Sequence, residues 1–245
     1  MRNLKLTIEY NGAEFFGWQK QKNCRTVQEE IEKAFLTLTG ENVSVEGSGR
    51  TDKGVHALGQ VASVQTSNIM PTKNFKIALN DLLPKDIFIK KVEEVDQNFQ
   101  ARFSAKRKTY KYIVCVGGER GAINNSLIAY YPYKVDIEKM REVAKLLIGK
   151  HNFKGFCNSD ASVTNFEREI YDLKINKKNR MYTFLVCGNG FLYNMVRIIV
   201  GTLLDVGRGK LSVERVKNAL ETGNRNNSGQ TMPACGLYLK NVEYV

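Results

Sequence analysis

Apolar and polar residues alternate along several stretches of the chain, as they do in half-buried β-strands. In residues 3–10 the apolar positions are Leu4, Leu6, Ile8 and Tyr10, which would share one face of a strand. The same alternation, or a short apolar run bounded by turn residues, predicts further strands at 43–48, 56–65, 86–95, 109–116, 167–176, 180–188 and 236–245.

Helical spacing predicts the remaining elements. Thr26 and Glu29 have the spacing of a capping box, which predicts a helix that starts there and ends near Leu38. A helix at 73–83 would end before Pro84, because the residue before a proline disfavours helical backbone. Further helices are predicted at 136–147, at 191–206, where most faces are apolar, and after Ser212, which would cap a short one.

Strands and helices are mixed in both halves of the chain, and each half opens on a strand. We therefore predict an α+β fold with two subdomains, residues 1–104 and 105–245. No low-complexity linker separates the two halves, so a site in a groove between them is the default expectation.

Composition narrows the class of protein. The chain has 245 residues, 42% of them hydrophobic, which is enough for a real core. No apolar run approaches the roughly 20 residues that span a bilayer, and the first residues form a strand pattern rather than a signal peptide, which predicts a cytoplasmic protein without a membrane partner. The five cysteines are scattered and form no C-x-x-C, which argues against a zinc cage and a disulfide framework.

A net charge of +12 suggests a polyanionic partner. Five cations fall within ten residues without an acid, and aromatic residues lie among them: Arg102, Phe103, Lys106, Arg107, Lys108, Tyr110, Lys111 and Tyr112. Cations for phosphates and aromatics for bases make up a surface that binds unpaired RNA. Two other interpretations stay open: a lysine-rich surface that confers solubility, and a strand whose aromatics face the core.

One carboxylate stands out in the segment GSGRTDKGVHA, residues 47–57. Asp52 lies in a glycine-rich turn, two residues after Arg50 and with no acidic neighbour. Clustered carboxylates for metal-dependent hydrolysis are absent from the turn, and a glycosidase-type pair would need a second acid from elsewhere. Dinucleotide and P-loop fingerprints are absent, and His56 and His151 lack metal-site spacing. A single activated nucleophile remains as a hypothesis.

Arg197 is a lone cation in the most hydrophobic predicted helix. Its side chain could extend to the protein surface along its own aliphatic stem. Alternatively it is buried against a carboxylate, for which Asp52 is the candidate, and such a pair would keep the aspartate ionised. The spacing alone leaves both readings open.

The segment GSGRTDKGVHALGQVASV resembles the signature of the tRNA pseudouridine synthase A family. The resemblance extends, in family order, to YNGAEFFGWQKQ, TVQEEIEKA, RFSAKRKTYKYIV, GNGFLYNMVRIIVGTL and GLYLKNVEYV, and so covers nearly the whole chain. It implies the pseudouridine synthase fold, in which two α+β subdomains like those of ferredoxin and ribonucleoprotein domains, with mixed, mostly antiparallel sheets, meet in a basic cleft.

The resemblance also implies roles for individual residues. Asp52 matches the family's catalytic aspartate, Tyr110 the tyrosine that stacks on the target base, and Arg197 the arginine that pairs with the aspartate. Arg50 matches an arginine that supports base flipping, and Leu237 an apolar residue at the active site. For Lys106, Arg107 and Lys108, in the second motif, we expect contacts with substrate phosphates.

The implied reaction converts uridine to pseudouridine at positions 38, 39 and 40 of the tRNA anticodon stem-loop, without cofactor or metal, in a homodimer. Attack at the sugar C1′ and a glycal route both stay open. Lys53 and Ser48 depart from common family residues, and 157–170 matches only toward its end, so a relative with a narrower or different RNA target is an alternative. A non-catalytic RNA-binding protein and an RNA hydrolase are the two rival functions.

Overall fold

The computed structural model describes residues 1–119, 121–158 and 163–244. Two segments discussed above include residues that the structure does not describe: 157–170, which matches the family only toward its end, and the closing strand predicted at 236–245. The chain forms two compact units, Met1–Lys106 with Tyr238–Val245, and Arg107–Leu237. The sequence analysis assigned all of 105–245 to one subdomain, whereas the closing strand joins the first unit because Tyr238 and Leu239 pair with His56 and Ala57.

The first unit contains an antiparallel sheet with one parallel addition. Its strands are β1 (Arg2–Tyr10), β2 (Glu46–Gly47), β3 (His56–Thr66), β4 (Ile87–Val95) and most of β10 (Leu237–Glu243). β1 pairs antiparallel with both β3 and β4, β2 is antiparallel to β3, and β10 is parallel to β3. The strand predicted at 43–48 is thus shortened to two residues, and the other strands of this unit are confirmed.

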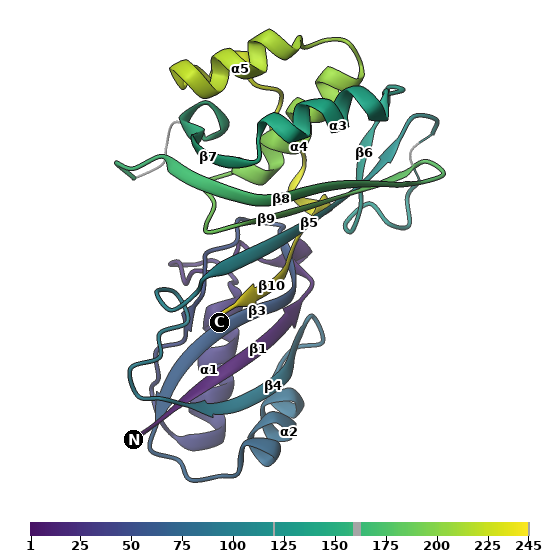
Figure 1. Cartoon of the computed structure of the whole chain (residues 1–245). Helices are drawn as coiled ribbons and strands as arrows, with labels where there is room; N and C mark the ends of the chain where they lie inside the picture. The colour runs from purple at the N-terminus through teal and green to yellow at the C-terminus, as the bar shows by residue number, and fades with distance from the viewer. Residues whose placement is uncertain (120, 159–162, 245) are drawn as a thin grey trace. The chain divides into compact units, whose positions relative to one another are not determined.

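Two helices, α1 (Val27–Thr39) and α2 (Thr72–Leu82), pack on the sheet of the first unit (Figure 1). Leu4, Leu6 and Ile8 of β1 are fully buried, as the alternation predicts, and the helices contribute Phe35 and Phe75, whose rings lie 5.4 Å apart.

The capping box predicted at the start of α1 is wrong. The side chain of Thr26 makes no capping hydrogen bond and is fully buried. The free N–H groups of the first turn donate instead to main-chain carbonyls of the preceding loop, Val27 to Gly17 at 3.2 Å and Gln28 to Trp18 at 3.0 Å. A tertiary contact therefore replaces the local cap, and the helix is tied to the loop at residues 15–18.

The second unit has an antiparallel sheet in which β7 (Gly149–Asn152), β8 (Glu167–Lys178), β9 (Met181–Gly188) and β5 (Arg107–Val116) are neighbours in that order. β6 (Ala129–Tyr131) adds to β5 in parallel. The sequence analysis missed β6 and β7, which are only three and four residues long and too short for an alternating pattern.

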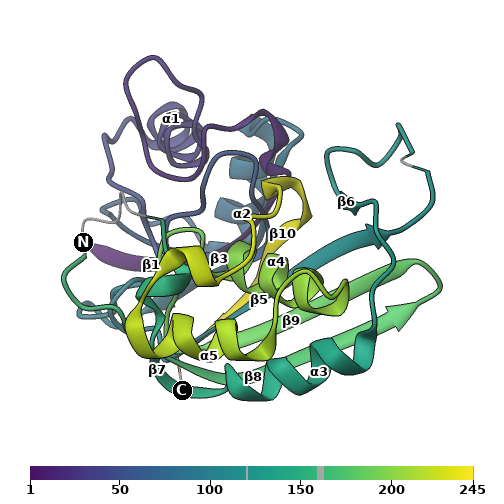
Figure 2. The same cartoon turned by 90° about the horizontal axis from the view of Figure 1, so that it is seen from above.

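Helices α3 (Ile137–Leu146), α4 (Met195–Gly207) and α5 (Val213–Thr222) cover one face of this sheet (Figure 1). In the view from above, α3 and α5 lie in front of β8 (Figure 2). Ser212 accepts the Arg215 N–H and caps α5 as predicted. Asp136 accepts N–H groups in the first turn of α3, a cap that the sequence analysis did not predict. Short 3-10 turns occupy Gly12–Glu14, Phe153–Phe156, Arg225–Asn227 and Ala234–Gly236.

The predicted start of α4 at residue 191 is wrong by four residues. Asn194 has a left-handed backbone, with φ 59° and ψ 7°, so helical geometry cannot extend through it. From Met195 to Gly207 every residue of α4 except Arg197 is buried. The apolar character that the sequence shows on most faces is therefore core packing.

The predicted fold class is confirmed: strands and helices mix in both units, and the strand pairs are mostly antiparallel. Among the helices that the structure describes, none is both long and apolar enough to cross a membrane.

Candidate functional site

Asp52 lies in a loop that we call the aspartate loop, residues 48–55, between β2 and β3. The segment 15–18 runs along this loop and fixes its backbone. The Gly54 N–H donates to the Phe15 carbonyl at 3.2 Å, and the Trp18 N–H donates to the Thr51 carbonyl at 3.0 Å. Bonds on both sides of Asp52 therefore restrain the position of its Cα atom.

Gly17 makes this close approach possible. Its φ is +99°, and a Cβ atom there would lie 2.5 Å from the Thr51 carbonyl oxygen and 3.3 Å from the Lys53 nitrogen. Since real Cβ contacts are longer than this, only glycine lets segment 15–18 pack directly on the peptides around Asp52.

Beneath the loop, a buried hydrogen bond joins the hydroxyls of Tyr10 and Thr51 at 2.7 Å. Burial raises the pKa of the Tyr10 hydroxyl above its ordinary value, so the hydroxyl stays neutral over the range in which enzymes work. Because the Thr51 side chain is almost fully buried, this bond ties the residue that precedes Asp52 to β1.

Two further bonds hold the start of the aspartate loop. The Ser48 hydroxyl donates to Gln60 Oε1 at 2.7 Å, and Gln60 Nε2 donates to the Gly49 carbonyl at 2.9 Å. Ser48, which departs from the common alanine, therefore has a structural partner on β3, and its hydroxyl orients the Gln60 amide.

The carboxylate-bearing residue Asp52 is itself partly exposed, and its main-chain carbonyl accepts the Val55 N–H at 3.1 Å in a tight turn. Cations lie on both sides of it in the sequence. Arg50 is exposed and its Nε donates to Gln19 Oε1 at 3.2 Å, while the Lys53 ammonium lies 3.9 Å from the centre of the Phe16 ring.

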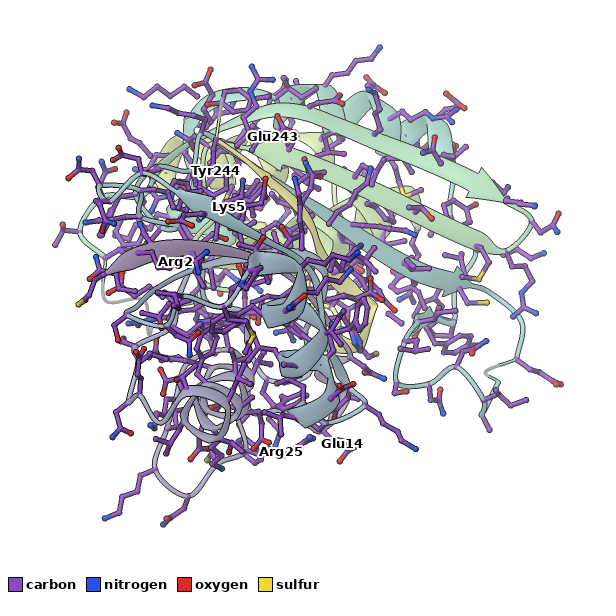
Figure 3. All side chains as sticks on the ribbon, turned by 90° about the horizontal axis from the view of Figure 1, so that it is seen from below. Arg2, Lys5, Glu14, Arg25, Glu243 and Tyr244 are labelled. Carbon is purple, nitrogen blue, oxygen red and sulfur yellow. The ribbon has the colours of Figure 1, made fainter. Side chains whose placement is uncertain are left out.

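A second cation–aromatic contact lies on the same segment. The Arg25 guanidinium is 4.1 Å from the centre of the Phe15 ring and makes a two-pronged pair with Asp86 at 2.7 and 2.9 Å. The hydrogen bonds that Arg25 donates to Asp86 raise the pKa of Arg25, and the charge of Glu14, labelled with Arg25 in Figure 3, makes a smaller contribution. This pair fixes the base of segment 15–18.

Tyr110 lies in β5, opposite Val186 of β9. Its side chain is only 9% exposed, and its ring meets that of Phe191 edge to face, with centres 5.1 Å apart. The position of Tyr110 in β5 and its contact with Phe191 therefore hold its ring in one orientation.

Arg197, in the first turn of α4, is held by two acceptors of its own unit. Its Nε donates to the Met232 carbonyl at 2.6 Å, and its Nη1 donates to Asn194 Oδ1. The Met232 N–H in turn donates to the Arg197 carbonyl at 3.3 Å. These bonds fix the plane of a partly buried guanidinium, so it does not simply extend into solvent. A pair between Arg197 and Asp52 remains a prediction.

Of the other predicted residues, Leu237 is 6% exposed; it follows the 3-10 turn at Ala234–Gly236 and is the first residue of β10. Lys106 and Arg107 are exposed, Lys108 is partly exposed, and the Arg107 guanidinium lies 5.0 Å from the centre of the Tyr171 ring. Arg50, Asp52 and Lys106 thus belong to the first unit, and the remaining predicted residues to the second.

The supporting residues Tyr10, Gly17, Gln60, Asn194 and Met232 were missed by the sequence analysis. Asn194 carried a local signal, since asparagine is enriched in left-handed backbone at helix starts and turns. The other four act through contacts that are distant in sequence. Among the described residues no three His, Cys, Asp or Glu side chains gather as metal ligands would.

A comparison with protein families matches residues 6–104 and 143–245 to the tRNA pseudouridine synthase model. The chain belongs to this family. The family and the enzyme class predicted from the sequence are thereby confirmed. The chain is also 46% identical over 244 residues to tRNA pseudouridine synthase A of Caldicellulosiruptor bescii, with both chains covered completely. With tRNA pseudouridine synthase A 2 of Clostridium perfringens it shares 44% over the same length, again with complete coverage.

Among solved structures, one chain of a Cbf5–Nop10–Gar1 complex matches 82% of the present chain over 54% of its own length, with 12% sequence identity and a TM-score of 0.35. A likeness of that size carries no conclusion about the site.

Proposed function

We propose that this member of the family isomerises uridine to pseudouridine in the tRNA anticodon stem-loop, at positions 38, 39 and 40, with Asp52 as the nucleophile. The observation that carries the proposal is the aspartate loop itself. Its one carboxylate is partly exposed while the backbone around it is bonded to segment 15–18 on both sides. Such preorganisation is what a nucleophile on a loop requires.

The target base must first leave the stack, at a cost of a few kcal/mol. The Asp52 carboxylate then attacks C1′, or assists formation of a glycal, and the bond between C1′ and N1 breaks. The uracil turns so that its C5 faces C1′, and a carbon–carbon bond forms there as the carboxylate leaves C1′. The C5 proton then departs and N1, freed from C1′, takes up a proton. The released carboxylate is unchanged, so substrate and product are isomers and no cofactor is consumed.

Tyr110 and Arg197 have complementary roles in this proposal. The Tyr110 ring stacks on the uracil, and its hydroxyl lies where the C5 proton departs, directly or through a water. Arg197 keeps Asp52 ionised through its guanidinium, whose orientation is supported by the bonds it donates to the Met232 carbonyl and to Asn194 Oδ1. Leu237 supplies an apolar wall against the base, and Arg50 helps the base to flip.

The basic residues serve substrate binding. The exposed cations Lys106 and Arg107 and the partly exposed Lys108 would neutralise tRNA phosphates, which makes affinity strongly dependent on salt. We also propose, from the family resemblance alone, that the enzyme acts as a homodimer, which sedimentation of the purified protein would test.

Release of tritium from tRNA labelled at uracil C5 tests this function. The proposal predicts release by the purified enzyme with no added metal and in the presence of a chelator. tRNAs that lack single target uridines would identify the modified positions. Tight tRNA binding without release would favour a non-catalytic RNA-binding protein, and chain cleavage that a chelator abolishes would favour a hydrolase.

A further inference from the structure

Phe16 is an exposed aromatic residue next to the aspartate loop. Its side chain is 44% exposed, and the Lys53 ammonium lies 3.9 Å from the centre of its ring. In the described part of the chain, Lys53 has no carboxylate at ion-pair distance. An uncompensated cation over an exposed ring is an arrangement suited to a ligand that brings both an aromatic surface and a negative charge.

The backbone fixes this pair beside Asp52. Phe15 and Gly17, the two neighbours of Phe16, both touch the aspartate loop, Phe15 through the N–H of Gly54 and Gly17 through the peptides on either side of Asp52. The Phe16 N–H donates to the Arg25 carbonyl at 2.9 Å. Phe16 therefore has an anchored backbone and an exposed ring.

We propose that Phe16 and Lys53 form a binding platform for one unpaired nucleotide of the RNA substrate, adjacent to the target uridine. The Phe16 ring stacks on the base, and the Lys53 ammonium leaves the ring to bind the phosphate of the same or the next nucleotide. The inference rests on the proposed function in that it takes the substrate to be RNA.

The chemistry of a nucleotide matches both members of the pair, the Phe16 ring and the Lys53 ammonium. A base presents a π-face of any sequence to an aromatic ring, and a lysine exchanges a weak exposed cation–π contact for a phosphate without rearranging the backbone. Lys53 follows Asp52 directly in the chain, so its backbone belongs to the aspartate loop, and its ammonium lies 3.9 Å from the centre of the Phe16 ring.

The first unit supplies a matched control. Phe88, on β4, is 49% exposed, and the Lys76 ammonium of α2 lies 5.8 Å from its ring centre. This second pair has the same composition and nearly the same exposure, but its residues make no contact with the aspartate loop in the described structure. Composition alone therefore predicts equal effects at both pairs, whereas the platform predicts an effect at one.

The test measures binding of an RNA hairpin with an unpaired loop, and of a duplex with the same stem, to the full-length protein carrying Asp52→Asn. Fluorescence anisotropy gives Kd at several salt concentrations. Phe16→Ala should weaken hairpin binding about 5- to 150-fold, the loss that one base–aromatic stack produces, and change duplex binding less than about twofold. Phe16→Tyr should bind the hairpin like the parent, because it keeps the ring.

Lys53→Ala should weaken hairpin binding more than duplex binding and reduce the salt slope of hairpin binding by about one unit. Phe88→Ala and Lys76→Ala should leave hairpin affinity within about twofold. Abasic substitutions through the loop then locate the stacked base: removing it weakens the Asp52→Asn parent but has no further effect on the protein that also carries Phe16→Ala.

Equal hairpin affinity with and without Phe16→Ala would overturn the platform, as would an equal loss from Phe88→Ala. Turnover is measured separately on the wild type by tritium release. If the wild type released no tritium while the dependence on Phe16 held, the proposed isomerisation would fail and the platform would stand as an RNA-binding site. If the wild type released tritium but Phe16→Ala left hairpin binding unaltered, the proposed isomerisation would stand and the platform would fail.

Discussion

Replacing Gly17 with alanine tests how far catalysis depends on the placement of the aspartate loop. The new Cβ would lie 2.5 Å from the Thr51 carbonyl oxygen, whereas ordinary contacts begin at 3.4 Å, so 3.4 − 2.5, or about 0.9 Å, must be gained by movement. The obstacle is backbone, so either the aspartate loop or segment 15–18 has to shift. A displacement near 1 Å at a reacting group costs about 10²-fold in rate.

The same substitution also lowers the free energy of unfolding. Alanine at positive φ costs about 1–2 kcal/mol, and overpacking adds about 1–3 kcal/mol. Gly40 separates these effects, because its φ is +73° but nothing lies within 4 Å of its added Cβ atom. Gly40→Ala should therefore lose stability through backbone strain alone and keep its kcat.

Single-turnover tritium release, at an enzyme concentration above Kd, measures the chemical step, and thermal unfolding measures stability. The reasoning predicts a loss of about 10²-fold in the single-turnover rate for Gly17→Ala and less than twofold for Gly40→Ala. Wild-type turnover by Gly17→Ala, or equal losses in both variants, would refute the claim that segment 15–18 positions Asp52.

Substitutions at three residues probe the second unit. Tyr110→Phe should change tRNA affinity little, because the ring remains, but lower kcat steeply in the tritium assay if the hydroxyl moves the C5 proton. In the proposed pair Arg197 favours the ionised form of Asp52, so Arg197→Met should raise the pKa of Asp52 and lower activity most at low pH, with partial recovery as pH rises. Arg197→Lys should restore little of this activity, because an ammonium cannot make the planar two-pronged contact. A pH–rate profile measures both effects. Asn194→Gly keeps the left-handed backbone but removes the acceptor for Arg197, so it should lower kcat with a thermal midpoint close to wild type, whereas Asn194→Asp should keep more activity.

Local patterns were sufficient for most of the fold. The burial of Leu4, Leu6 and Ile8 follows from alternation, and the cap at Ser212 follows from the side chain itself. Where prediction failed, a contact from elsewhere in the chain replaced the local one. Thr26 has the sequence of a cap, but its side chain makes no capping bond, and the carbonyls of Gly17 and Trp18 accept two N–H groups of the first turn instead.

The candidate site divides in the same way. The glycine-rich turn around Asp52 and the cation within an apolar helix at Arg197 are visible in the sequence as residues that their surroundings do not explain. The groups that hold them are not visible there. Gln60, for example, contacts the loop from its position on β3, and no spacing rule connects it with Ser48 or Gly49. Lys53 is visible in the sequence as a departure from the family pattern that could contact a phosphate or face solvent, but its closeness to Phe16 is visible only in the structure.

The central claim is that Asp52 is the nucleophile, and the most direct test compares Asp52→Asn with the wild type. The substitution keeps the shape of the side chain but removes its charge, so the loop should fold normally. We expect tRNA affinity close to that of the wild type and no tritium release above background, even in single-turnover reactions at saturating enzyme. Release by Asp52→Asn at a tenth of the wild-type rate or more would contradict the account.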